Sequence, residues 1–469
     1  MLRAGTWHLK ERMNSKNFYI TLFFILTCFR LLIIPIGTND LAVWISDGLH
    51  ILNTLSISRV DLYSLHPNLE FIYPARFSNI IFGAIYKLFD FQGVAIFLRL
   101  WIFAAIFLIY KGSQKNNFQW NEKNFVILSL STIGITLFLD RPACFAVLLA
   151  IYIFPFFEKS SLKLKEVILL FSLFILWNNL HSSFFIILPI ILYKFLISVY
   201  KKKEILNSFK IGTIFFLSIW FTPEGENILH YVYQTITTSK NRNILEWSNV
   251  FKFAYPQTSI LLLLIFLFII YRFYQLKKIK KLIYSPLFPL LFLGLGNIRN
   301  AIWLFLIAPY LLTKYDLWYK SDNKFFVNKK LNLFIIISLS FSIIYISPWI
   351  HLNKKNNFGF GTDSPIMATK VILKKTIRQK IFNQWEVGSY LTLKQTNPIY
   401  IDTRNIIYNQ SIYDEYIKIL NCTSTCARFL NKYNFTTVIL RKEKWPLINY
   451  LKTNWTKAFE DKDFILFFK

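Results

Sequence analysis

Two aspartates, seven residues apart, stand out in a strongly apolar chain. Asp40 and Asp47 lie in "NDLAVWISDG", directly after the first long apolar run, and Trp44 lies between them. If this segment is helical, its spacing places both carboxylates on one face, two turns apart. Such a pair can supply a general base or can ligate a divalent metal ion. Helix capping and solvation explain the same residues without any chemistry.

Two arginines lie at the ends of other apolar runs. Arg141 lies in "LDRPA", where Asp140 and Pro142 suit the start of a helix and the arginine is not needed for capping. Arg299 lies in "GNIRNA". A guanidinium that lines a wet cavity can bind a phosphate. A local ion pair, or a side chain that reaches up to the membrane interface, is the alternative.

Further polar side chains gather where apolar runs are joined. "LWNNLHSSF" carries Asn179 and His181, "TPEGEN" carries Glu224, and "ILEW" carries Glu246. These four residues are candidates for binding a substrate. A histidine at a helix end is more often a hydrogen-bonded structural residue, and Glu224 after Thr-Pro can simply complement a helix dipole.

The elements that must position these residues are long apolar runs. Of 469 residues, 54% are hydrophobic and only 17% are charged, against about 25% charged in soluble domains. Segments 18–37, 258–274 and 331–350 match or approach the ~20 apolar residues that cross a bilayer. The composition predicts a polytopic α-helical membrane protein. The first run keeps Arg30 and lacks a small-residue cleavage site, so we expect an anchor rather than a removed signal peptide.

The distribution of lysines predicts the topology. Lysine-rich joining segments, the N-terminus among them, alternate with lysine-poor segments that carry the polar residues named above. The positive-inside rule places the first set in the cytoplasm and the second set on the outer face. The net charge of +29 is thereby explained, and no nucleic-acid partner is expected.

About 11 crossings follow from this alternation. Segment 77–91 is also apolar, but it is short, amphipathic and interrupted by Lys87 and Asp90. We therefore expect it to lie in the membrane interface, within a first outer loop of about 38–93 in a transmembrane domain of residues 1–353. The expected spans are 18–37, 94–110, 124–140, 142–157, 166–180, 183–200, 209–221, 257–274, 283–296, 300–313 and 331–350.

The chain changes character after residue 353. "KIFNQWEVGSYLTL", "TVILRK" and "FILFF" alternate helix-like and strand-like pieces. Segment 354–469 is therefore expected to form a small α/β domain on the outer face. Asp402, Arg404 and Tyr408 in "IDTRNIIY" are weak candidates for binding an acceptor. Asp402 and Arg404, at a strand end, can instead simply pair with each other.

Four cysteines divide into two pairs by their surroundings. Cys28 and Cys144 lie in apolar runs and are expected to be packing residues. Cys422 and Cys426 in "NCTSTC" can form a disulfide if their segment faces an oxidising compartment. Both outcomes stay open at this point.

Several of these motifs, in this order, resemble bacterial membrane proteins of the glycosyltransferase C-superfamily. The motifs are "NDLAVWISDG" with the later "DLYS", "DRP" at a helix start, "WNNLH", "TPEG", "ILEW" and "RN". "FNQWEVGSYL" and "PIYIDTRNIIY" resemble the C-terminal domain of those proteins. The resemblance covers nearly the whole chain and points to relatives of oligosaccharyltransferase, mannosyltransferase and aminoarabinose transferase. The first loop departs from the family pattern, because Asp47 and His50 follow Trp44 at a different spacing.

The resemblance implies a multi-pass enzyme of the bacterial inner membrane whose C-terminal domain is periplasmic or extracellular. Such an enzyme moves a sugar from a polyprenyl-phosphate-linked donor to an outer-face acceptor, in envelope glycan or glycolipid synthesis. Its partners are membrane lipid and the sugar donor. In this family an acid of the first outer loop acts as base or metal ligand, which maps onto Asp40 and less directly onto Asp47. Arg141 and Arg299 are then candidates for binding the donor phosphate.

Two other classes of function stay open. One is a non-enzymatic lipid or polysaccharide transporter, or a polymerase component, and the other is an inert membrane scaffold. A transporter is expected to place ionisable residues at mid-membrane in broken helices. Here the polar clusters lie at helix ends, which favours the transferase.

Overall fold

A computed structural model divides the chain into two compact units. Unit 1 comprises Met1–Pro35, Ile96–Thr222 and Arg242–Asn353, and unit 2 comprises Ile36–Ala95, Pro223–Asn241 and Lys354–Lys469. Unit 2 thus joins the first outer loop to the expected C-terminal domain. The residues that the structure describes are 18–32, 39–115, 142–242, 248–253, 256–275, 277–314, 364–375, 379–394, 398–404, 406–422, 426–443 and 445–469, with single positions between 125 and 135.

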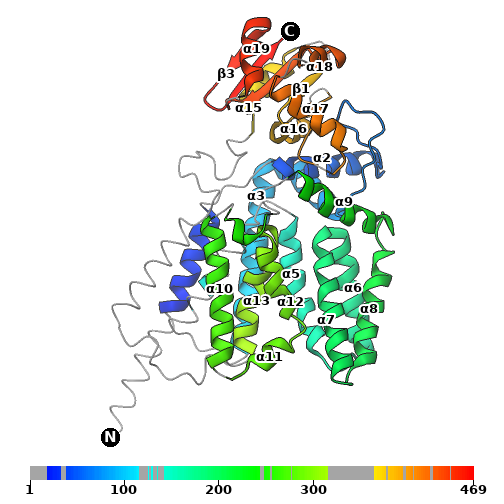
Figure 1. Ribbon diagram of the computed structural model, residues 1–469, viewed down its shortest axis with the longest axis vertical. Helices are drawn as coiled ribbons and strands as arrows, with labels where there is room; N and C mark the ends of the chain where they lie inside the picture. Colours follow the sequence, from blue (N-terminus) through cyan, green and yellow to red (C-terminus); the bar gives the residue numbers. More distant parts are fainter. Residues whose placement is uncertain are drawn as a thin grey trace. The chain divides into compact units, whose positions relative to one another are not determined.

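Unit 1 is built from apolar helices that pack side by side (Figure 1). After Phe18–Leu32 and the second part of α3 (Arg76–Lys115) they are α5 (Ala143–Ile153), η1 (Phe154–Glu158), α6 (Leu164–Leu180), η2 (Ser182–Ile186), α7 (Ile187–Tyr200), α8 (Ile205–Ile219), η4 (Val250–Lys252), α10 (Pro256–Gln275), α11 (Ile279–Ile283), α12 (Phe288–Gly296), η5 (Ile298–Asn300) and α13 (Ala301–Lys314). α6 packs against α5 and α8, and α13 packs against α10 and α12. Such helices satisfy their own backbone groups and leave only side chains to be buried.

Two helices, Arg76–Lys111 and Ser182–Tyr200, are long and apolar enough to cross a membrane, judged by length and composition. Shorter apolar helices coincide with further expected spans, and they are Phe18–Leu32, Ala143–Glu158, Ile205–Ile219, Ser259–Gln275 and Ile298–Ala308. The expected spans 124–140 and 331–350 lie outside the described residues, apart from single positions in the first. The total of about 11 crossings therefore stays a prediction.

α3 combines the two segments that the sequence separates into 77–91 and 94–110. Its backbone leaves the helical conformation at Asp90, where φ is 55° and ψ is −167°. The helix is thus two pieces joined at a kink, and the kink falls at one of the two charges that interrupt the apolar pattern. The first piece belongs to unit 2, and the chain from Ile96 belongs to unit 1. A position of 77–91 in the membrane interface stays a prediction.

Unit 2 contains a four-stranded mixed sheet in the order β1-β2-β4-β3. β1 pairs parallel with β2, whereas β4 pairs antiparallel with both β2 and β3. The strands are β1 (Ile381–Asn383), β2 (Thr437–Arg441), β3 (Thr456–Glu460) and β4 (Phe464–Phe468). The helices of unit 2 are α2 (Asn39–Thr54), the first part of α3, α9 (Asn227–Asn241), α15 (Ile366–Leu373), α16 (Trp385–Leu393), α17 (Gln410–Leu420), α18 (Cys426–Lys432) and α19 (Pro446–Asn454). The expected α/β character of segment 354–469 is confirmed for its described residues.

Both faces of the sheet are buried. Alternate residues of β2 and β4 enter two separate apolar clusters, with Val438 in one and Ile439 in the other. The first cluster includes residues of α17, α18 and α19, and the second includes residues of α15 and α16. Near-continuous apolar strands such as "TVILR" and "FILFF" follow from this two-sided burial.

The first outer loop adds to this sheet. Ile399 forms a parallel bridge with Ile381 of β1 on one side and with Ser64 of the loop on the other. The Leu65 N–H donates to the Ile399 carbonyl at 2.8 Å, and the Ile399 N–H donates to the Tyr63 carbonyl at 3.1 Å. The loop is therefore fastened by backbone hydrogen bonds to residues that follow it by more than three hundred positions.

A disulfide links Cys422 at the end of α17 to Cys426 at the start of α18. This pairing was one of two outcomes that the sequence left open. Cys28 and Cys144 are free, and Cys144 is buried as a packing residue. Cys28 is exposed, so it does not pack as the sequence predicts.

Candidate functional site

The two first-loop aspartates lie on one helix, as their spacing predicts. α2 carries Asp40 in its first turn and Asp47 two turns later. Asp40 is half-buried and has no hydrogen-bond or ion-pair partner among the described residues. Asp47 is 2% exposed and is held by Arg76 and Asn79 of α3. The two acids therefore differ sharply in their freedom to react.

Arg76 is the centre of a buried charge cluster. Its Nη1 lies 2.9 Å from Oδ1 and 3.1 Å from Oδ2 of Asp47. Its Nε and Nη2 lie 3.4 and 3.3 Å from Oε1 of Glu224. The Asn79 amide adds a 2.7 Å hydrogen bond to Oδ2 of Asp47. One guanidinium thus joins two acids that the sequence places in different loops.

Close backbone packing sets the geometry of this cluster. A Cβ on Gly48 of α2 would lie 1.8 Å from the Asn79 carbonyl oxygen, and a Cβ on Gly83 of α3 would lie 2.6 Å from the Gly48 carbonyl carbon. Only glycines allow α2 and α3 to approach so closely. Glu224 is presented by a turn whose next residue, Gly225, has a φ of +53°. The expected helix start at 222–224 is instead this turn, and α9 begins at Asn227.

The Arg76 cluster is incomplete in its hydrogen bonding. Glu224 is 3% exposed, and its Oε2 is buried without a hydrogen bond. The Nε of Arg59, a residue whose side chain is 63% exposed, is 3.9 Å from that oxygen. Asn79 Oδ1 is a second buried acceptor without a donor. An unsatisfied buried acceptor costs about 1–3 kcal/mol, so each such atom calls for an explanation.

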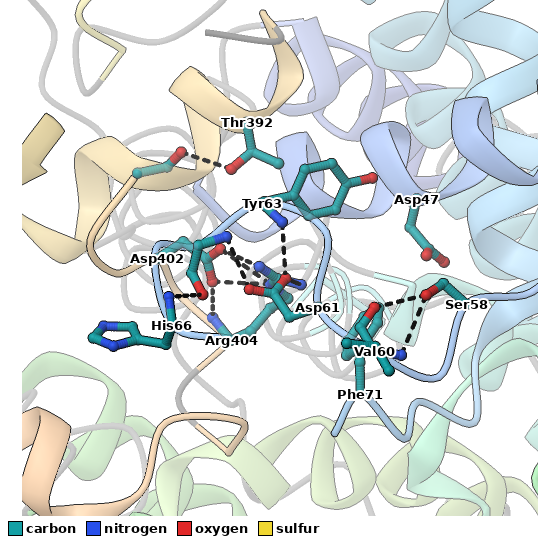
Figure 2. Close-up of polar contacts among 12 residues, drawn as sticks. Asp47, Ser58, Val60, Asp61, Tyr63, His66, Phe71, Thr392, Asp402 and Arg404 are labelled. Atoms are coloured by element: carbon teal, nitrogen blue, oxygen red, sulfur yellow. Dashed lines mark hydrogen bonds and ion pairs between the residues drawn. The ribbon is translucent and has the colours of Figure 1, made fainter. Parts of the chain in front are cut away.

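A second buried cluster lies in the same unit, where the loop meets the sheet (Figure 2). Arg404 donates from Nε and Nη2 to both oxygens of Asp402, at 2.6–3.1 Å. Its Nη1 forms an ion pair with Oδ1 of Asp61 at 2.7 Å, at an angle outside the range of a hydrogen bond. The backbone N–H groups of Tyr63 and Ser64 donate to the Asp61 carboxylate. All four carboxylate oxygens of this cluster have a donor or cation within 3 Å.

The electrostatics of this second cluster favour full ionisation. Burial acts to raise the pKa of Asp61, but the Arg404 charge and hydrogen bonds from Ser64 outweigh it and hold that pKa below its usual value. Burial acts to lower the pKa of Arg404, but Asp402 and Asp61 raise it well above the ordinary range. Burial and the neighbouring Asp402 charge raise the pKa of Tyr408, whose hydroxyl accepts the Asp402 N–H. Asp402 and Arg404 therefore pair with each other, which is the alternative stated for them from the sequence, and Tyr408 joins them through the Asp402 N–H. A role in binding an acceptor stays a prediction.

Phe71 lies between the two clusters. The guanidinium carbon of Arg76 lies 4.4 Å from the centre of its ring, and that of Arg404 lies 4.9 Å from it. Each contact is a cation–π interaction, which gains strength when the cation is desolvated. One aromatic ring therefore packs against both buried arginines of unit 2.

The remaining predicted site residues lie in unit 1 or outside the described residues. Asn179 donates to the carbonyls of Ile175 and Phe221, and His181 caps the end of α6 and accepts the Ser183 N–H at 3.1 Å. These hydrogen bonds hold the end of α6, and a role of Asn179 and His181 in binding substrate stays a prediction. Arg299 is half-buried on η5. Arg141 and Glu246 lie outside the described residues. A shared cavity for these residues and the first-loop acids stays a prediction.

A divalent metal ion at the first-loop acids stays a prediction. Among the described residues, no group of three His, Cys, Asp or Glu side chains could hold a metal ion. Asp47 already binds the guanidinium of Arg76, a charge that competes with a dication.

Sequence reasoning missed the basic partners of the acids. Arg76 follows "FIYPA" and opens a helix, so it reads as an ordinary helix-end arginine. In the sequence, Asp61 stands out only as part of the "DLYS" motif. The first loop contains several acids, and a buried acid needs a buried cation. A count of the charges in this loop could therefore have indicated that an arginine pairs with these acids.

Comparison with known proteins shows the fold. No protein-family model matches the sequence, and no curated protein matches it. The archaeal oligosaccharyltransferase AglB from Archaeoglobus fulgidus, in complex with an inhibitory peptide and a dolichol-phosphate, matches with a TM-score of 0.57 and 11% identity over 90% of this chain and 69% of that one. The apo form of the A. fulgidus oligosaccharyltransferase matches with a TM-score of 0.55 and 9% identity, over 91% and 70% of the two chains.

A bacterial structure matches along its whole length. ArnT from Cupriavidus metallidurans, bound to undecaprenyl phosphate, has a TM-score of 0.50 and 8% identity over 96% of this chain and 97% of that one. At such low identity the likeness concerns the arrangement of the chain. The chain therefore shares the fold of an oligosaccharyltransferase and of ArnT.

Proposed function

We propose that this chain is a bacterial membrane glycosyltransferase that moves a sugar from a polyprenyl-phosphate-linked donor to an acceptor on the outer face. The observation that carries the proposal is the fold match over nine-tenths of the chain to structures solved with dolichol-phosphate and undecaprenyl phosphate. Membrane lipid and the polyprenyl-linked donor are the proposed partners. The proposed place is the inner membrane, with unit 2 in the periplasm or outside the cell.

Asp40 is the proposed general base. The acceptor hydroxyl gives its proton to the Asp40 carboxylate as its oxygen attacks the anomeric carbon. The bond from that carbon to the phosphate oxygen breaks, and polyprenyl phosphate leaves. Asp40 suits this role because no described residue occupies its carboxylate, whereas Asp47 is held by Arg76 and Asn79. A positioned base contributes about 10²–10⁴-fold to the rate.

The other candidates keep supporting roles in the proposal. Arg141 and Arg299 are proposed to stabilise the leaving phosphate, since guanidinium groups bind phosphate through paired hydrogen bonds. Asp47 and Glu224 instead fix α2 against α3 through Arg76, and so hold Asp40 in place. This reassigns Asp47 from chemistry to positioning.

Transfer from a labelled donor tests the proposal. We expect Asp40→Asn to lower the rate of transfer from radiolabelled polyprenyl-phosphate sugar by about 10²-fold or more. Asp463→Asn, an exposed acid elsewhere in unit 2, is the matched control and is expected to be neutral. Full activity in Asp40→Asn would remove Asp40 from the mechanism. Absence of transfer by the folded wild-type protein across a donor panel would favour the transporter or the scaffold.

A further inference from the structure

A row of aromatic rings runs from the buried cluster to an open end at Trp44. Phe71 and Tyr73 are nearly parallel, at 13° and 6.0 Å between ring centres. Tyr73 and Trp44 are also stacked, at 19° and 6.4 Å. Tyr231 of α9 packs edge-on against Tyr73 at 6.1 Å. Tyr73 is the middle ring of the row, and Trp44 is its last member.

The two ends of this row differ. Phe71 is buried and packs against the guanidinium of Arg76. Trp44 is half-buried, and Tyr73 is its one ring contact among the described residues. No described residue accepts a hydrogen bond from its indole N–H. The buried end therefore fixes the stack. At the outer end, the Trp44 ring can still pack against a ligand.

Asp40 lies one helical turn before Trp44 on the same face of α2. Its carboxylate has no partner among the described residues. The Asp40 carboxylate repels a phosphate bound at the indole. It also disfavours an acyl chain there, because the chain would remove water from the charged carboxylate. A neutral ring with an apolar C–H face and hydroxyl groups at its edge suits both side chains, because the face packs on the indole and the hydroxyls donate to the carboxylate.

We propose that Trp44 and Asp40 form a binding site for one pyranose ring, with the indole beneath the C–H face of the sugar. This inference rests on the proposed function and names what its site binds. The ring belongs either to the donor sugar or to a glycan acceptor. The stack through Tyr73 and Phe71 to Arg76 keeps the indole in position. Trp44 is thus a specificity residue, and not the base.

Binding without turnover tests the site. The purified full-length protein is titrated with polyprenyl-phosphate-glucose, polyprenyl-phosphate-mannose, bare polyprenyl phosphate and methyl α-mannoside. We expect Trp44→Leu to weaken binding of sugar-bearing probes roughly 3- to 10-fold, the size of one aromatic stacking contact, and to leave bare polyprenyl phosphate unchanged. Trp44→Phe keeps a ring and is expected to retain most of the affinity. Trp220→Leu, an exposed tryptophan of unit 1, is the matched control.

The outcomes separate the sources and the hypotheses. Loss for the lipid-linked sugars alone places the donor sugar on Trp44, whereas loss for methyl α-mannoside alone places an acceptor glycan there. Equal affinity in Trp44→Leu, or an equal loss for bare polyprenyl phosphate, overturns the site. Trp44→Phe keeps an aromatic ring, so a folded Trp44→Phe protein should still bind sugar. Complete loss of sugar affinity in that variant would contradict stacking. If the wild-type protein binds sugar through Trp44 but transfers none, the proposed function is wrong and the proposed sugar site stands.

Discussion

Unit 2 contains two buried clusters of the same composition and different completeness. Each holds one arginine between two carboxylates, and both arginines pack on Phe71. In the cluster of Arg404 every carboxylate oxygen has a donor or cation within 3 Å. In the cluster of Arg76, Oε2 of Glu224 and Oδ1 of Asn79 have none.

This difference indicates that the Arg404 cluster holds the loop in place, whereas the Arg76 cluster belongs to the candidate site. A buried network whose acceptors all have partners rigidifies a structure, whereas each acceptor without a partner carries a penalty. The Nη1 of Arg404 makes no hydrogen bond, but it lies in ion-pair contact with Asp61. The Arg404 cluster joins the loop to the sheet, where nothing needs to change. The Arg76 cluster holds Asp47, which lies on α2 two turns after the proposed base Asp40, and this cluster contains acceptors without a partner. Polar atoms without a protein partner, such as Oε2 of Glu224 and Oδ1 of Asn79, are expected at a site that binds a substrate.

Removal of Arg404 has the largest expected effect on stability. Arg404→Met leaves Asp61 and Asp402 buried without a counter-charge, which costs about 3–5 kcal/mol. We expect a large drop in the thermal unfolding midpoint of the protein in detergent. Arg404→Lys keeps the charge and loses the forked geometry of the guanidinium, so its unfolding midpoint is expected between those of Arg404→Met and the wild type. Arg428→Met, an exposed arginine of α18, is expected to melt like the wild type, and an equal midpoint for Arg404→Met would refute the fastening role.

Matched amide substitutions compare the clusters directly. Asp402→Asn replaces an acid whose two oxygens both bind Arg404, whereas Glu224→Gln replaces an acid with one unpaired oxygen. We expect Asp402→Asn to lower the free energy of unfolding by about 2 kcal/mol more than Glu224→Gln does. Limited proteolysis of the loop at graded denaturant concentrations measures this difference. The reverse order would identify the Arg76 cluster as the fastener.

The smallest effect concerns pH and the side chain of His66, which packs on Tyr400 at 4.8 Å and is buried with no partner for Nε2. Burial lowers its pKa, although hydrogen bonding to the Tyr400 backbone and the charges of Glu415 and Asp61 oppose this. Between pH 6.5 and the lowered pKa, the unfolded state binds a proton that the folded state refuses. Stability therefore falls as the pH drops below about 6.5, by at most about 1.4 kcal/mol per pH unit.

Replacement of this histidine isolates its contribution. His66→Phe keeps an aromatic ring and removes the titrating group, so the dependence of the melting midpoint between pH 7.5 and 5.5 becomes flatter. At pH 7.5 its stability is expected to stay within about 1 kcal/mol of the wild type. Unchanged pH dependence would mean that His66 does not titrate in this range.

The sequence was sufficient for features that repeat locally. Long apolar runs located the helices and short apolar runs located β2 and β4, because each pattern reflects the burial of its own segment. The spacing of Asp40 and Asp47 correctly placed both on one helix. The partners of the acids were not predictable, because Arg76 meets Glu224 and Asp61 meets Arg404 across long separations with no local signal. Charge pairing of this kind depends on the folded arrangement alone.

The distance along the chain between Asp61 and Arg404 has a consequence for biosynthesis. Asp47 and Arg76 emerge from the ribosome close together, but Glu224 comes much later, and Arg404 follows Asp61 by more than three hundred residues. The nascent loop consequently carries an acid whose counter-ion does not yet exist. Chains that stop before residue 404 are expected to expose this loop to quality-control proteases, so that the first loop is protected only after the segment around Arg404 has been made.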